Sequence, residues 1–401
     1  MPGFCRYPSA GVYQTPKDTP NATTQPTTTS STCTASLLIE RPTFPGQPLQ
    51  SAITLKKTKS NMKEGKTLTE IAAELHRQKS NMRDFIAPTQ QLTLEHPELR
   101  VSDKGYFPVT DHAHSQIAGH LKIPKGYYDR LRSTPELLNR NVNHWLSQRE
   151  GEKRLVRTLD GNARALLSER YRPFDNYQVA LNSLEALKAA DCRVASCEVT
   201  SRRFYLKAVS NRIETEVKKG DVVQAGVVIS NSEVGSGSLR VEPLIYSLIC
   251  DNGMISADSS YRRPHIGSAL TSKNSGAIEF FTDETREASD QVVFLQVRDI
   301  VAATMTDTGF EQLVERFAAS QEKRLEADAF ETVELLRKNE SLAESEGKGI
   351  LASLLRGEDS DTLFGLVNAV TDYSKKVESY DRATELERLG GKLLEGAGYA
   401  A

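Results

Sequence analysis

The sequence predicts an α+β protein, with a mainly antiparallel sheet and packed helices, followed by an α-helical C-terminal region. Strand patterns concentrate in the middle of the chain, where the apolar, β-branched runs 222–229 and 239–249 are separated by a segment rich in glycine and serine. Two such runs are typical of an antiparallel hairpin. Helical spacing of apolar residues precedes these strands and returns after about Asp290.

Composition divides the chain into three regions. Residues 1–62 are rich in Thr, Ser, Pro and Gln, and such a segment cannot bury enough apolar surface to offset its conformational entropy. We therefore expect a disordered, low-complexity N-terminal segment over residues 1–62. An α+β core over residues 63–285 and an acidic α-helical region over residues 286–401 are expected to follow.

The core is expected to open with an amphipathic helix, because Leu68, Ile71 and Leu75 fall on one helical face. Further along, Asp175 can cap a second long helix, and extended apolar runs predict strands. The remaining elements expected here are strands at 92–94, 106–109, 155–159 and 194–209, and two short helices broken at Pro124.

The C-terminal region is expected to contain several helices. Phe310, Leu313 and Phe317 would line one face of the first long helix. Thr308 and Glu311 have the spacing of a capping box at its start. Further helices are expected at 348–355 and 362–379.

Composition also excludes several classes of protein. With 401 residues, of which 38% are hydrophobic and 26% charged, the chain suits a water-soluble globular protein. No run approaches the roughly 20 consecutive apolar residues that cross a bilayer, and residues 1–30 lack the apolar part of a secretory signal. We therefore expect a cytoplasmic protein with no membrane partner. The five cysteines are scattered and never spaced C-x-x-C, so no disulfide framework or zinc finger is predicted.

The net charge of −2 conceals a strong asymmetry along the chain. Residues 276–401 contain 14 Lys and Arg against 26 Asp and Glu, whereas the first 275 residues contain 37 against 27. A basic body followed by an acidic helical tail is often met in proteins that bind polyanions. The asymmetry therefore favours nucleic acid as a partner.

Three blocks of sequence resemble a known family. They are residues 67–75 leading to 84–89, the run GNARALLSERYRPFDN at 161–176, and ISNSEVG at 229–235 continuing through 250–254. Together they are similar to a family of phage- and plasmid-borne proteins, the domain of unknown function 932, over most of residues 62–303. The resemblance implies residence on a mobile genetic element. It implies no reaction, cofactor or catalytic residue, because the family has no agreed activity.

A basic and aromatic row is predicted on one strand of the core. Residues 201–207 read SRRFYLK, and period-2 alternation places Arg203, Tyr205 and Lys207 on one face of the strand. Cations for the phosphates beside a ring for base stacking suit single-stranded nucleic acid. The alternative is the ordinary solvated face of an antiparallel sheet. The cations expected to support the row are Arg170, Arg172, Arg262 and Arg263.

A second pattern partly resembles a helix-turn-helix. Ala118 is small enough to let two helices pack, and Tyr128 can anchor the second helix in the core. The sequence departs from the motif at Lys122, where the turn usually has glycine, and Pro124 follows almost at once. A plain helical hairpin is the alternative interpretation.

No cofactor or metal is expected. His112, His114 and His120 lie close together in the sequence but lack the spacing of metal ligands. The glycine-rich segment 235–238 is not followed by the Gly-Lys-Ser/Thr of a phosphate-binding loop. No catalytic residue is therefore assigned.

The leading hypothesis is a non-enzymatic nucleic-acid-binding protein of a phage or plasmid, acting on single-stranded DNA as an accessory in replication or recombination. A second hypothesis is an enzyme of unrecognised type at the 231–235 loop and the 250–253 turn, in which Glu233, Asp251 and His265 would converge. A third is an interaction or assembly protein, including a homo-oligomer, with the apolar face of the helix that begins near residue 308 exposed.

Overall fold

The computed structural model describes residues 63–218, 220–248, 252–256, 260–265, 283–395 and 398–400. Within these ranges helices alternate with antiparallel sheets, and the C-terminal part is helical, so the predicted α+β class is confirmed. Residues 1–62 and Asp251, to which some of the sequence-based expectations apply, lie outside the described residues.

A six-stranded antiparallel sheet forms the centre of the fold. Its strand order is β11-β10-β9-β8-β7, and β12 also pairs with β10. The predicted hairpin is confirmed, since β9 and β10 pair from Arg240 opposite Ser230 to Ser247 opposite Val223. The strands are β7 (Cys192–Val199), β8 (Phe204–Lys218), β9 (Asp221–Asn231), β10 (Leu239–Ser247), β11 (Gly253–Ile255) and β12 (Tyr261–Arg263).

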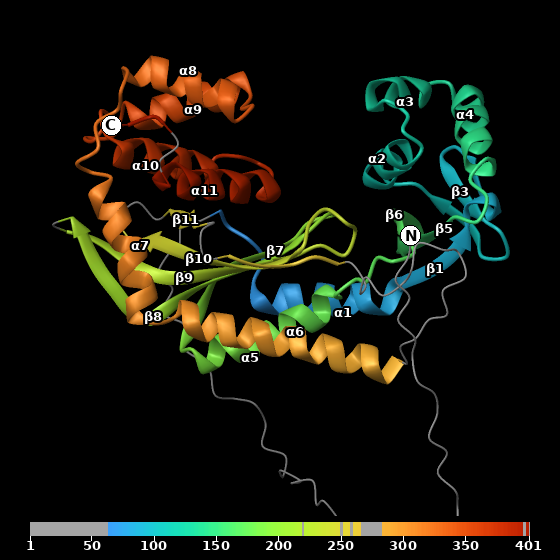
Figure 1. Ribbon diagram of the computed structural model, residues 1–401, viewed down its shortest axis with the longest axis horizontal. Helices are drawn as coiled ribbons and strands as arrows, with labels where there is room; N and C mark the ends of the chain where they lie inside the picture. Colours follow the sequence, from blue (N-terminus) through green and yellow to red (C-terminus); the bar gives the residue numbers. More distant parts are fainter. Residues whose placement is uncertain are drawn as a thin grey trace, which may run out of the picture. The chain divides into compact units, whose positions relative to one another are not determined.

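Helices α1 (Leu68–Asn81), α5 (Asn176–Ala189) and α6 (Asp283–Thr304) cover one face of this sheet (Figure 1). The predicted first helix is confirmed, and a capping box between Thr67 and Glu70 fixes its start. Phe204 and Leu206 of β8 join these helices in one apolar cluster. This face therefore holds much of the hydrophobic core.

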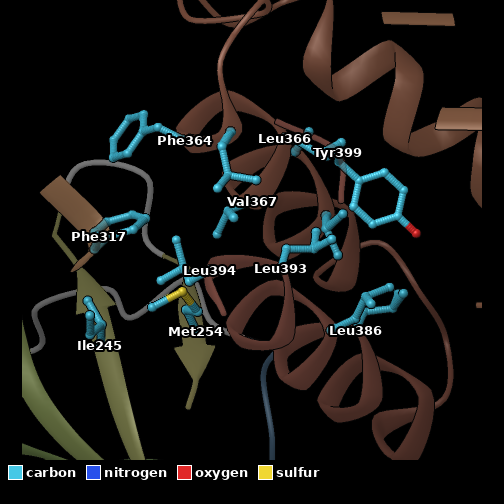
Figure 2. Close-up of a cluster of buried hydrophobic side chains, with 14 of the residues drawn as sticks. Ile245, Met254, Phe317, Phe364, Leu366, Val367, Leu386, Leu393, Leu394 and Tyr399 are labelled. Atoms are coloured by element: carbon cyan, nitrogen blue, oxygen red, sulfur yellow. The ribbon is translucent and has the colours of Figure 1, made fainter. Parts of the chain in front are cut away.

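The C-terminal helices cover the other face and one edge of the sheet. Figure 2 shows Ile245 and Met254 of the sheet in one apolar cluster with side chains of the C-terminal helices. Phe310 and Phe317 are buried in the same cluster, so the apolar face expected on this helix is confirmed but is not exposed. The helices are α7 (Asp307–Ala319), α8 (Ala329–Asn339), α9 (Glu344–Leu354), α10 (Leu363–Ser374) and α11 (Tyr380–Leu394).

Residues between α1 and α5 form a smaller α+β module with a hydrophobic cluster of its own. Its two sheets have the orders β1-β5-β6 and β2-β3-β4. The side chains of His112 and Gln116 contact the main-chain oxygen of Val234 and so join the module to the large sheet. The strands are β1 (Met82–Pro88), β2 (Leu92–Glu95), β3 (Glu98–Val101), β4 (Gly105–Pro108), β5 (Lys153–Leu159) and β6 (Asn162–Ser168), and the helices are η1 (Thr89–Gln91), α2 (Asp111–His120), α3 (Lys125–Leu131) and α4 (Pro135–Ser147).

Of two predicted helix caps, the one at α7 is wrong and the one at α5 is right in position. The cap of α7 is Thr306, whose hydroxyl accepts from the amide of Gly309, rather than Thr308. Asp175 stands at the N-cap of α5 but makes no capping bond, because its carboxylate pairs with Arg157 at 3.1 Å. None of the described helices has the length and apolar character to span a membrane.

Candidate nucleic-acid interface

The predicted row on β8 alternates as expected, but most of it is buried instead of exposed to solvent. Arg203, Tyr205 and Lys207 share a face opposite Phe204, as expected. However, Tyr205 and Lys207 are each 0% exposed, so the prediction that they form an outward surface is wrong. The physical reason is that α11 lies over this face of the sheet (Figure 1). Both side chains contact residues of α11 instead of solvent.

The buried part of the row joins the sheet to α11. The ammonium group of Lys207 pairs with the carboxylate of Glu387, and lies 4.8 Å from the ring centre of Tyr380. Burial lowers the pKa of Lys207, and the nearby Glu387 carboxylate opposes that shift. The Tyr205 hydroxyl donates to Asp381 at 2.9 Å. These contacts satisfy buried polar groups and give Tyr205 and Lys207 a structural role.

The outer end of the same face carries arginines that gather around the β9–β10 loop. The Arg203 side chain is half-buried, and its Nε donates to the main-chain oxygen of Ser236 at 3.1 Å. Arg262 of β12 stands opposite Arg240 of β10 in the strand pairing. Both direct Nε at the hydroxyl of Ser238, at 3.1 Å from Arg262 and 3.5 Å from Arg240.

A further arginine reaches this site from α11. Arg388 donates from Nε to both carboxylate oxygens of Glu242, at 2.9 and 3.0 Å, and from a terminal nitrogen to the Ser230 hydroxyl at 3.3 Å. Arg240 lies 3.5 Å from the same Glu242 carboxylate. Burial lowers the pKa of Arg240, and the Arg388 and Arg262 guanidinium groups act in the same direction. We refer to Arg203, Arg240, Arg262 and Arg388 as the arginine cluster.

Within the part of the chain that the structure describes, the guanidinium groups of this cluster outnumber the carboxylates that contact them. Among the described residues, Glu242 is the carboxylate that directly contacts its guanidinium groups, and Glu242 is itself 1% exposed. Arg262 is exposed and the side chains of the other three are half-buried. Guanidinium groups that outnumber their carboxylates and remain partly open to solvent suit the binding of an anion, above all a phosphate.

The other predicted cations are not brought to this cluster. Arg170 is exposed on the connection between β6 and α5, and Arg172 pairs with Asp290 of α6 at 3.0 Å. Arg263 is exposed, but alternation along β12 places it on the opposite face from Arg262. Arg240 and Arg388 were not predicted. Arg240 lies in the predicted strand at 239–249 and could have been included as a basic residue there, whereas nothing local indicated Arg388.

The residues of the alternative enzyme site take part in a structural network. Glu233 is 5% exposed, and its two carboxylate oxygens accept from Arg164 and from the amide of Asn176, both at 2.6 Å. His265 stacks on Tyr171 with ring centres 5.2 Å apart, and burial lowers the pKa of His265 to about 4. Asp251 lies outside the described residues.

The charged side chains around Glu233 also include a buried cation. Arg157 is 1% exposed and reaches Asp84 at 3.0 Å, Asp175 at 3.1 Å and the main-chain oxygen of Glu233 at 2.9 Å. This network links the small module to the β9–β10 loop. Within the described part of the chain, no three His, Cys, Asp or Glu side chains gather in a way that could hold a metal ion.

Comparison with known proteins gives one match. The family model described as "Domain of unknown function (DUF932)" matches residues 164–390, which is more than half of the chain. The matched segment contains the large sheet, α11 up to residue 390 and the whole arginine cluster. No curated protein and no solved structure matches the chain.

Proposed function

The chain belongs to the family described as a domain of unknown function (DUF932), and because that description names no activity, we propose a function from the arginine cluster. The protein binds the phosphate backbone of nucleic acid, without catalysing a reaction. This proposal rests on how three arginines of the cluster converge. Arg240 and Arg262 both approach the Ser238 hydroxyl, and Arg240 and Arg388 both approach the Glu242 carboxylate.

Positive charges held close together repel each other, which raises the free energy of the arginine cluster. Arg240 and Arg262 approach one hydroxyl, and Glu242 neutralises only part of the combined positive charge. A bound phosphate would supply the missing negative charge and would accept several N–H bonds in the fork geometry that guanidinium groups favour. Arg202, exposed in the turn before β8, would extend the positive surface.

The chemistry also indicates how nucleic acid would be recognised. Tyr205, the ring expected to stack on bases, is buried under α11. Tyr261 of β12 directs its hydroxyl to Gln296 of α6 on the opposite face. We therefore propose contact through phosphates, with little dependence on base sequence. We also propose that the protein assists replication or recombination of a phage or plasmid by binding single-stranded DNA.

A salt series with labelled oligonucleotides tests this function. Binding of single-stranded DNA by the full chain should weaken as salt rises, with a slope that reports the number of phosphates neutralised. Arg262→Glu should weaken binding and lower that slope by about 1. Because Arg262 is exposed, the substitution should leave the fold intact.

Arg298→Glu is the matched control. Arg298 is an exposed arginine on α6, which covers the opposite face of the sheet. Its replacement changes the net charge by the same amount and should leave the salt slope unchanged. Equal effects of the two substitutions, or no binding of wild-type protein at low salt, would refute the proposed function.

A further inference from the structure

The small module contains a pair of helices that the arginine cluster does not use. Helix α2 ends at His120 and α3 begins at Lys125, so four residues connect them. Lys122 adopts the left-handed backbone conformation, with φ of 57°. Pro124 is the N-cap residue of α3, a place at the helix start that proline tolerates. The two departures noted in the sequence are therefore accommodated, because Lys122 has the backbone that glycine would usually provide.

The apolar residues of this pair hold the helices in a fixed arrangement. Ile117 and Ala118 of α2 are 1% and 2% exposed, and Tyr128 and Leu131 of α3 are 0% and 5% exposed. All four belong to the hydrophobic cluster of the small module. The Tyr128 hydroxyl also bonds to the buried ring of His114 at 2.9 Å. One face of each helix is therefore buried in the hydrophobic core of the small module.

The outer face of α3 is exposed to solvent. Gly126, Tyr127, Asp129 and Arg130 are all exposed on it, as is Lys125 at its start. Helix α2 directs His112 and Gln116 to the β9–β10 loop instead. The large sheet therefore anchors α2 through side chains on that helix, and the outer residues of α3 remain accessible.

From these observations we infer that α2 and α3 form a helix-turn-helix that places α3 in the major groove of duplex DNA. In such motifs the second helix enters the groove and the first crosses the backbone. With 7 residues, α3 is about 10 Å long, and the groove is about 12 Å wide. Arg130 would meet the groove edge of a guanine, the commonest specific contact of arginine.

Gly126 lies on the outer face of α3 and leaves room for a partner there. A side chain at Gly126 would meet no protein atom within 4 Å, so the fold does not require glycine there. Glycine also weakens a helix relative to alanine. An exposed helical glycine at the centre of the outer face is consistent with close approach by a partner from outside, as when a helix backbone lies against base edges.

The test is selection from a pool of random-sequence duplexes by the full chain, followed by titration of an enriched duplex. Wild-type protein is expected to enrich a short base sequence. Gly126→Glu should lower affinity for that duplex by about tenfold or more, because a carboxylate would face the bases and phosphates. Arg130→Ala should lower it by about tenfold and relax the preference at one position.

Ala302→Glu is the matched control, because Ala302 is an exposed helical residue of α6, which lies outside the small module. Loss in Gly126→Glu with retention in Ala302→Glu would support the inference. No enriched sequence, or equal losses in both variants, would overturn it. Single-strand binding through the arginine cluster should survive Gly126→Glu and be lost in Arg262→Glu, so the two proposals can fail separately.

Discussion

Breaking the buried pair between Lys207 and Glu387 should destabilise the protein strongly. The two side chains are 0% and 1% exposed, so removal of either partner leaves the other without water or a counter-charge. Loss of one partner of a buried pair typically costs about 3–5 kcal/mol, whereas replacement of both by apolar residues of similar volume is often neutral. We therefore expect Glu387→Leu to lower the free energy of unfolding by about 3–5 kcal/mol.

Urea denaturation of four proteins completes the test: wild type, Lys207→Met, Glu387→Leu and the double variant. The double variant should recover most of the stability lost in Glu387→Leu, since no unpaired charge remains. It should also bind single-stranded DNA with wild-type affinity and salt slope, because Lys207 lies under α11. A double variant as unstable as the sum of the single variants would refute the reasoning on stability. Loss of DNA binding in a folded double variant would refute the structural role assigned to Lys207.

Two further predictions concern stability. Burial lowers the pKa of His114, His120 and His265 to about 4, so the unfolded chain binds protons more readily between about pH 6.5 and 4. The free energy of unfolding should therefore be highest above pH 6.5 and fall by up to about 2 kcal/mol per histidine at pH 5, and an unchanged urea midpoint from pH 7 to 5 would contradict this. Gly391→Ala would place Cβ 1.9 Å from a carbonyl oxygen of β11 and should lower the melting temperature, whereas Gly119→Ala, which meets no atom within 4 Å, should raise it by helix propensity.

Local sequence patterns predicted much of the fold. Alternation in β8 correctly separated Phe204 and Leu206 from Tyr205 and Lys207, because backbone geometry alone fixes which residues share a face. It could not reveal what covers each face. The partner of Lys207 is Glu387, 180 residues further along the chain, and no periodicity within one strand reports a contact at that distance.

The candidate site was predicted only in part for the same reason. Arg203 and Arg262 were selected as local basic residues, and both contact the β9–β10 loop, Arg203 at Ser236 and Arg262 at Ser238. Arg388 comes from a helix whose surface charges look ordinary in the sequence. For the predicted helix-turn-helix, the backbone angle at Lys122 shows only that the turn can form without glycine. Residue identity alone did not indicate this conformation.

The position of α11 has a consequence for the order in which the protein is made. The inner strands of the large sheet leave the ribosome well before residues 380–394, so Lys207 and its neighbours remain in water until α11 has been made. Contacts so distant along the chain are slow to form and leave partly assembled sheets prone to aggregate. Ribosomes stalled before α11 has emerged would therefore carry chains that protease digests readily, while emergence of α11 should confer resistance.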